Sequence, residues 1–138
     1  MRLFRLLPAA LLVLGLSWLG AAPARAAVLV PFTETHFTEQ QFKAAQAKGE
    51  PILVEIFATW CPTCAQQKPI IDRLAATPQF KGLVILRVDF DSQKDVVRAF
   101  GARMQSTLVV FHGADLRGVT VGETDPAAIK ALLAKSLS

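Results

Sequence analysis

Two cysteines, the only ones in the 138-residue chain, stand at positions 61 and 64 with Pro62 and Thr63 between them. Thiols at this spacing can close a disulfide and exchange it with another disulfide through a mixed intermediate. The loop that such a bond closes is too short to stabilise a fold much by restricting the unfolded chain. The pair is therefore a candidate for chemistry, and a purely structural disulfide is the weaker alternative.

The pair lies where a buried strand is predicted to end and a helix to begin. Residues 51–57 form a nearly continuous apolar run, typical of a strand covered on both faces. Residues 62–76 have the pattern of a helix, in which Pro69 predicts a kink. Cys61 would then lie at the helix N-terminus, where unpaired N–H groups and the helix dipole favour a thiolate. We expect Cys61 to attack a substrate disulfide and Cys64, one turn later, to resolve the mixed disulfide.

A metal site is the main competing interpretation of the two cysteines. A Cys-x-x-Cys pair can be half of a zinc site, but the other half would need cysteines or histidines at suitable spacing. His36 and His112 are the only histidines, and neither belongs to a paired motif. The sequence therefore predicts no zinc site and no cofactor. A carrier of copper or another metal that uses the same thiols stays as the alternative to an enzyme.

Strands and helices alternate along the rest of the chain. Further strands are expected at residues 27–35, 83–90, 107–111 and 116–121, and further helices at 38–48, 93–100 and 124–135. Thr38 followed by Gln41 predicts a capped helix start. Strands that alternate with helices need crossover connections, so we expect an α/β fold with a mixed central sheet and helices on both faces.

The first 26 residues have the pattern of a secretory signal peptide. A basic start precedes an apolar run from Leu6 to about Ala22, and Ala24-Arg25-Ala26 offers small residues where a signal peptidase cuts. We expect residues 1–26 to be removed and residues 27–138 to form one domain, periplasmic or secreted. An uncleaved membrane anchor is the second possibility, because the run approaches the length that spans a bilayer.

The net charge of +4 comes largely from that first segment. Without Arg2, Arg5 and Arg25, the chain keeps 12 of its 15 basic residues and all 11 acidic ones, which leaves a net charge of about +1. No basic stripe is present elsewhere, so the sequence predicts no binding to nucleic acid.

From about Phe37 to Leu137 the chain resembles the thioredoxin family. The matching stretches are Pro51-Ile52-Leu53-Val54, Ala58-Thr59-Trp60-Cys61-Pro62-Thr63-Cys64, Pro69, Val88-Asp89-Phe90-Asp91, Phe100-Gly101, Thr107-Leu108-Val109-Val110-Phe111 and Val121-Gly122. The resemblance implies a thioredoxin-like fold and a monomer that exchanges disulfides with protein substrates. The Cys-Pro-Thr-Cys motif is also similar to that of periplasmic thioredoxins of cytochrome c maturation, although this chain is too compact for their usual insertion. The resemblance favours a reductase supplied by a membrane electron donor and leaves oxidase or isomerase open.

The family pattern also suggests roles for individual residues. Glu55 stands where thioredoxins bury an acid, so we expect a buried carboxyl with a raised pKa that exchanges a proton with Cys64. Arg87 stands where thioredoxins often have a lysine near this acid. A role in packing or in a salt bridge fits that position as well as a role in catalysis. The substrate-binding residues implied by the resemblance are Trp60, Gln105, Ser106 and Gly122.

Ser106 is the clearest departure from the family pattern, because thioredoxins have a cis-proline at the aligned position. A cis bond before a residue other than proline costs about 2.5–4 kcal/mol. The loop is therefore expected to turn trans or to hold a strained bond. The hydroxyl of Ser106 would lie near Cys61, where it could donate a hydrogen bond to that sulfur or instead cap its own loop.

Overall fold

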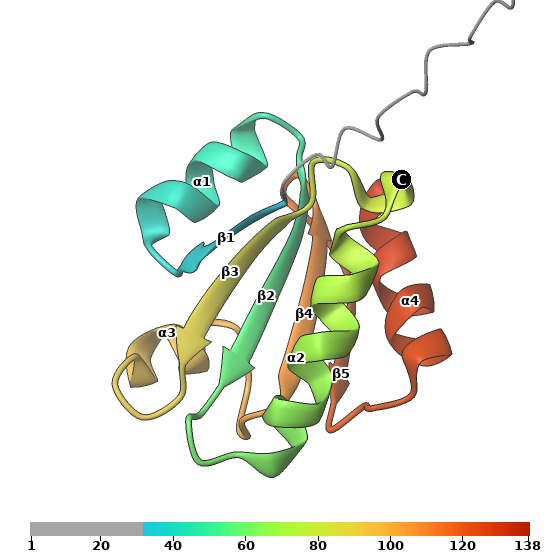
Figure 1. The fold of residues 1–138 in the computed structure, drawn as a ribbon. Helices are drawn as coiled ribbons and strands as arrows, with labels where there is room; N and C mark the ends of the chain where they lie inside the picture. Colours follow the sequence, from blue (N-terminus) through green and yellow to red (C-terminus); the bar gives the residue numbers. More distant parts are fainter. Residues whose placement is uncertain (1–31) are drawn as a thin grey trace, which may run out of the picture.

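The computed structural model describes residues 32–138, so the predicted signal peptide lies outside the described residues. Five strands form one sheet in the order β1-β3-β2-β4-β5 (Figure 1). The strands are β1 (Thr33–His36), β2 (Pro51–Phe57), β3 (Val84–Asp89), β4 (Thr107–His112) and β5 (Asp115–Val121). The first three run parallel, β4 is antiparallel to β2, and β5 is antiparallel to β4. The predicted mixed sheet is therefore confirmed.

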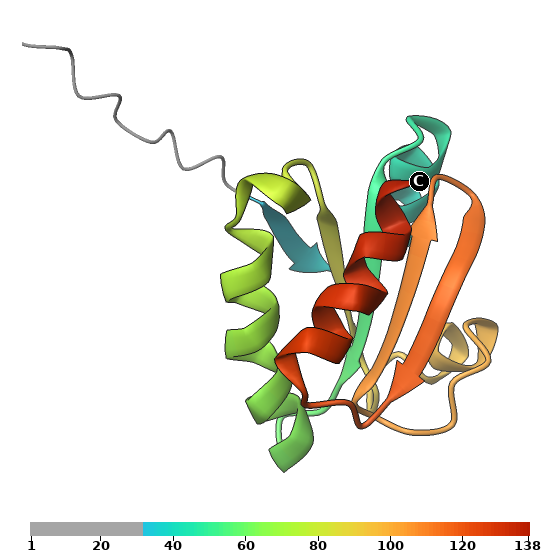
Figure 2. The same ribbon diagram turned by 90° about the vertical axis from the view of Figure 1, so that its right-hand side faces the viewer.

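Helices cover both faces of the sheet, which confirms the expected α/β thioredoxin-like fold (Figures 1 and 2). One face carries α1 (Glu39–Ala47) and α3 (Lys94–Ala99), and the other carries α2 (Pro62–Ala75) and α4 (Pro126–Ala134). Two short 3₁₀ turns at Pro78–Phe80 and Lys135–Leu137 complete the described secondary structure. No helix among residues 32–138 is both long and apolar enough to cross a bilayer.

Local sequence signals set the element boundaries closely. The Thr38 hydroxyl accepts the N–H of Gln41 at 3.2 Å and caps α1, as predicted. Asp125 caps α4 in the same way, with Pro126 in the first turn. The predicted strand at 27–35 is described only from Thr33 onward, and the 3₁₀ turn at Pro78–Phe80 was not predicted.

The central strand β2 divides the apolar core in two. Ile52, Val54 and Ile56 pack toward α1 and α3, whereas Leu53 packs toward α2 and α4. All four side chains are fully buried because successive residues of a strand point to opposite, covered faces. This burial explains why the sequence of β2 reads as a continuous apolar run interrupted only by Glu55.

Candidate active site

The two cysteines lie at the start of α2, directly after β2 reaches the lower edge of the sheet in Figure 1. Cys61 is the N-cap residue, and its sulfur accepts the backbone N–H of Cys64 at 3.1 Å. The two residues are joined as a disulfide, with their Cα atoms 5.3 Å apart, and both are buried. The structure thus places Cys61 where the helix favours a negative sulfur, as the sequence predicted.

An apolar cluster packs around the disulfide. Phe57, Ala58 and Phe90 form it together with the two cysteines. Phe90 comes from the turn after β3, and its backbone N–H donates to the carbonyl of Phe57 at 2.8 Å. This bond holds the turn against the end of β2, so a residue that sequence reasoning left without a role packs on the cluster that contains the reactive pair.

Trp60 forms an exposed aromatic surface beside Cys61, as expected for a rim residue. Its side chain is 58% exposed, and the indole Nε1 donates to Asp91 Oδ2 at 2.7 Å. Asp91 belongs to a turn organised by Asp89, which accepts hydrogen bonds from Ser92 and Asp91. Hydrogen bonds from the N–H and hydroxyl of Ser92 hold the pKa of Asp89 below its ordinary value. The indole is therefore fixed in place although its face is open.

Glu55 is buried on β2, and Arg87 faces it from the neighbouring strand β3. Arg87 Nε donates to a Glu55 carboxylate oxygen at 2.9 Å, and the guanidinium lies 3.8 Å from the centre of the Phe57 ring. Burial raises the pKa of Glu55, and the charge and hydrogen bond of Arg87 oppose this only in part. The predicted burial and raised pKa are confirmed, and Arg87 both pairs with the acid and packs on the aromatic ring.

A chain of charged side chains connects this ion pair with the surface. Arg87 Nε also lies 3.9 Å from Glu34 on β1, and Lys68 Nζ lies 2.9 Å from Glu34. Lys68 binds Asp72 one turn further along α2 at 2.7 Å. Burial lowers the pKa of Lys68, but the hydrogen bonds to Asp72 and Glu34 outweigh it and leave the pKa raised. Sequence reasoning missed the part of this network beyond Glu55 and Arg87, because its members lie on separate elements, β1 and α2.

Ser106 lies immediately before β4 in a trans peptide, and the described residues contain no cis peptide bond. Its φ of +58° lies in the left-handed region, which is uncommon for a residue other than glycine. Its hydroxyl donates to the carbonyl of Gln105 and not to a sulfur of the disulfide, so the structure shows the loop backbone as its partner, the second of the two expected. The short serine side chain reaches its own backbone more readily than a neighbouring element. The carbonyl of Ser106 accepts the N–H of Gly122 at 2.9 Å, which brings two predicted substrate-binding residues together.

Gln67 is the main residue of this region that sequence reasoning missed. It lies on α2 one turn after Cys64 and is fully buried. Its Nε2 donates to the carbonyls of Ser106 at 3.2 Å and Glu123 at 2.8 Å. One signal could have indicated it, since the helical spacing of Cys64, Gln67 and Ile71 puts all three on one buried face.

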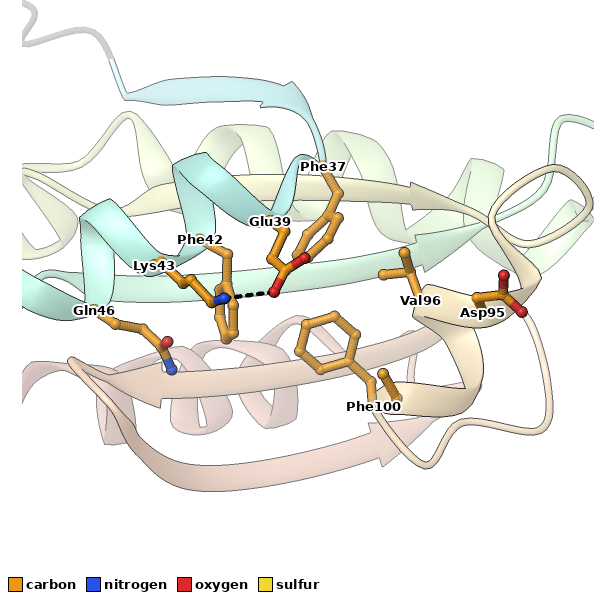
Figure 3. Close-up of a pocket in the computed structure, with 9 residues that line it drawn as sticks. Phe37, Glu39, Phe42, Lys43, Gln46, Asp95, Val96 and Phe100 are labelled. Atoms are coloured by element: carbon orange, nitrogen blue, oxygen red, sulfur yellow. Dashed lines mark ion pairs between the residues drawn. The ribbon is translucent and has the colours of Figure 1, made fainter.

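A cavity between two helices lies away from the disulfide. It has a volume of about 410 Å³ between α1 and α3 and is lined by Phe37, Phe42, Val96 and Phe100, with an ion pair between Lys43 and Glu39 at its rim (Figure 3). None of the predicted site residues lines it. Within residues 32–138 no three histidine, cysteine or acidic side chains are grouped to hold a metal ion.

Comparison with known proteins agrees with this geometry. The sequence matches the thioredoxin family over residues 33–135. The chain belongs to the thioredoxin family. It is 32% identical to a thioredoxin of Aspergillus fumigatus over 67% of this chain and 88% of that protein. It is 28% identical to thioredoxin of Pseudomonas aeruginosa over 76% of this chain and 93% of that protein.

Solved structures of other thioredoxin-family proteins are similar in fold. Trxlp from Edwardsiella tarda superposes with a TM-score of 0.69 at 35% identity, covering 71% of this chain and 95% of that one. Malassezia sympodialis thioredoxin superposes with a TM-score of 0.67 at 25% identity, covering 80% of this chain and 96% of that one. With its disulfide-forming pair at Cys61 and Cys64, this thioredoxin-family protein is a thiol–disulfide oxidoreductase.

Proposed function

We propose that this thioredoxin-family enzyme is exported and reduces disulfides in protein substrates, with Cys61 as the attacking thiol. The observation that carries the proposal is the place of the Cys61 sulfur at the N-terminus of α2, where it accepts the N–H of Cys64. A sulfur held there is stabilised as a thiolate, which is the nucleophilic form. The buried carboxyl of Glu55 supplies a group that can accept a proton.

The first half of the reaction starts from the reduced pair. The Cys61 thiolate attacks one sulfur of the substrate disulfide, a bond forms between them, and the substrate S–S bond breaks. The second substrate sulfur leaves as a thiolate and takes up a proton from solvent. The exposed indole of Trp60 offers the substrate an aromatic surface beside the new bond.

The second half releases the substrate. The Cys64 thiol gives its proton to the Glu55 carboxylate, and the resulting thiolate attacks the Cys61 sulfur. The Cys61–Cys64 disulfide forms, the mixed disulfide breaks, and the first substrate sulfur leaves as a thiolate. Two electrons have then passed from the pair to the substrate. A further turnover needs a dithiol donor, and outside the cytoplasm we assign that role to a membrane protein.

Trapping of the intermediate tests the roles of the two cysteines. Cys64→Ala should accumulate mixed disulfides with substrate proteins that dithiothreitol releases, because nothing resolves them. Cys61→Ala should accumulate none. Faster alkylation of Cys64 than of Cys61 in the reduced protein at neutral pH would reverse the assignment.

The direction of the reaction is tested by equilibrium with glutathione. A reductase should have a potential near that of thioredoxin, about −270 mV, whereas a value near −120 mV is that of a strong oxidant. The latter result would replace reductase by oxidase without changing the roles of the cysteines.

Export rests on the pattern of residues 1–26, and mass spectrometry of the protein from a periplasmic fraction tests it. We expect a mature chain that begins at Ala27. Recovery of residues 6–22 with the protein in a membrane fraction would indicate an uncleaved anchor instead.

A further inference from the structure

The side-chain amide of Gln67 joins three parts of the molecule that are far apart in sequence. The residue lies on α2, the helix that carries both cysteines, and its Nε2 reaches two loop carbonyls. Ser106 precedes β4 by one residue, and Glu123 follows β5 by two. Because Nε2 carries two hydrogens, one amide can donate to both carbonyls at once.

These two loops lie at the end of the sheet where the disulfide is found. Ile56 near the end of β2 pairs with Thr107, which places Ser106 beside the chain that leads into Cys61. Thr107 pairs in turn with Val121, and the N–H of Gly122 donates to the carbonyl of Ser106. The carbonyl of Ser106 therefore accepts both the neighbouring loop and the active-site helix.

The backbone of Ser106 needs such support. A serine with a φ of +58° is in a sparsely populated conformation, and this persists only where the surroundings hold it. The hydroxyl of Ser106 contributes a bond only to the adjacent carbonyl of Gln105. The longer-range restraint comes from Gly122 and Gln67.

Packing alone does not account for an amide at this position. Gln67 is fully buried, and its Oε1 has no hydrogen-bond partner among the described residues. An apolar side chain of the same length would fill the space and bring no unpaired acceptor of its own. The contact that an apolar side chain cannot make is the double donation from Nε2.

We propose that Gln67 is a positioning residue for protein substrates, which holds the Ser106 and Glu123 loops in register with the nucleophilic cysteine. The inference rests on the proposed action on protein disulfides. A protein substrate must contact the loops around the cysteines, whereas a small disulfide needs only the sulfur. Loss of the amide should therefore affect the two kinds of substrate differently.

Gln67→Met is the direct test, since methionine is unbranched, similar in length and needs no buried partner. With insulin as the protein disulfide, kcat/KM should fall about tenfold, mainly through KM, which corresponds to the loss of ordinary hydrogen bonds. With hydroxyethyl disulfide, and in a titration of the Cys61 thiolate by absorbance, the variant should match the wild type. Gln66→Met is the matched control, because Gln66 is the exposed neighbour on the same helix.

A conservative variant separates positioning from packing. Gln67→Asn keeps the amide but shortens it by one methylene, so it can reach one carbonyl at most and should recover only part of the activity on insulin. Amide hydrogen exchange at Gly122 should be faster in Gln67→Met than in the wild type, and unchanged in Gln66→Met. Thermal unfolding of each variant establishes that the folded proteins are being compared.

Three results would overturn the assignment. Unchanged insulin kinetics in Gln67→Met would show that the amide only fills space. An equal loss on insulin and on hydroxyethyl disulfide would show that it acts on the thiols and not on substrate positioning. A wild-type protein that reacts with hydroxyethyl disulfide but not with insulin would overturn the proposed function together with this inference.

Discussion

The two faces of the sheet share the same strands but hold different kinds of side chain. Toward α1 and α3, strand β2 presents Ile52, Val54 and Ile56 to a core in which phenylalanine rings pack edge to face. Toward α2 and α4, the same strand presents Leu53 and Glu55. The side of α2 and α4 carries the cysteines, the buried acid with its arginine, and Gln67.

The seven residues of β2 thus contribute to two different layers. Side chains on one face stabilise the apolar core, and side chains on the other face adjoin the reactive groups. A shift of one position along β2 moves a side chain from a purely apolar layer to the layer that contains the reactive groups. The apolar side also contains the cavity of Figure 3, yet no predicted site residue lines it. The presence of a cavity therefore does not locate the active site, whereas the positions of the cysteines and of Glu55 do.

The largest expected effect comes from the apolar face. Ile52→Ala should lower the free energy of unfolding by about 2–5 kcal/mol, because it removes a fully buried side chain and leaves a cavity. The exchange rate of the folded variant should stay within about twofold of the wild type. Urea unfolding followed by circular dichroism, with an exchange assay in the absence of urea, measures both. A large loss of rate in a fully folded protein would show that the faces are not independent.

A change at Glu55, three residues further along the same strand, should slow the exchange reaction and leave the protein folded. Glu55→Gln should fold but resolve the mixed disulfide more slowly, on the order of 10²-fold, because Cys64 loses its proton acceptor. Stopped-flow kinetics should show the mixed disulfide accumulating, with initial attack by Cys61 little changed. Turnover equal to that of the wild type from about pH 6 to 9 would remove Glu55 from the mechanism.

The same variant has a defined effect on the pH dependence of stability. Since the pKa of Glu55 is higher in the folded chain than its ordinary value of 4.5, the folded state binds the extra proton between the two values. Protonation of Glu55 therefore stabilises the folded wild type. This contribution is complete below the pKa of the unfolded chain and is lost as pH rises through the pKa of the folded chain. Relative to the wild type, Glu55→Gln should therefore gain stability as pH is raised from about 4 to 8. Urea titrations across this range should show the difference, and a constant offset would contradict it.

The smallest change in stability is expected from the charged network around Lys68. Lys43, on the helix α1 that covers the other face of the sheet, serves as the matched control. Lys68→Met should cost less than about 1 kcal/mol, because partly exposed ion pairs contribute little. It should raise the pKa of Glu55 slightly, since the Lys68 charge lowers that pKa. Lys43→Met removes an exposed ion pair with Glu39 at the rim of the cavity in Figure 3 and should leave the titration of Glu55 unchanged. Carboxyl NMR titrations of both variants make the comparison, and equal shifts would contradict it.

Predictions from the sequence were most accurate where short-range rules apply. The apolar run of β2, the capping residue Thr38, and the place of Cys61 at a helix start were all confirmed. Each depends on residues only a few positions apart, and the local backbone decides them. The expected burial and raised pKa of Glu55 came from resemblance to a family, and the structure supplied the physical cause, which is desolvation opposed by Arg87.

Predictions from the sequence stayed open where the partner of a polar group had to be identified. The hydroxyl of Ser106 had two expected partners, a cysteine sulfur or its own loop, and in the structure it donates to the adjacent carbonyl of Gln105. The sequence shows that a serine stands at this position, but it does not show the backbone angle φ that the serine adopts. The distance from this hydroxyl to either partner depends on how the loop folds, so the choice between them could not be derived from the sequence.

The sequence by itself determined the reactive pair, the strand and helix on either side of it, and the one acid within the apolar strand. Only the tertiary structure decided what surrounds them. Gln67 bonds to carbonyls 39 and 56 residues away, and Arg87 meets Glu55 across 32 residues. These contacts exist because the parallel pairing of β2 with β3, and the packing of α2 against the β4 and β5 loops, bring distant residues together. Periodicity and spacing describe neighbours along the chain, whereas burial and hydrogen bonding are set by neighbours in space.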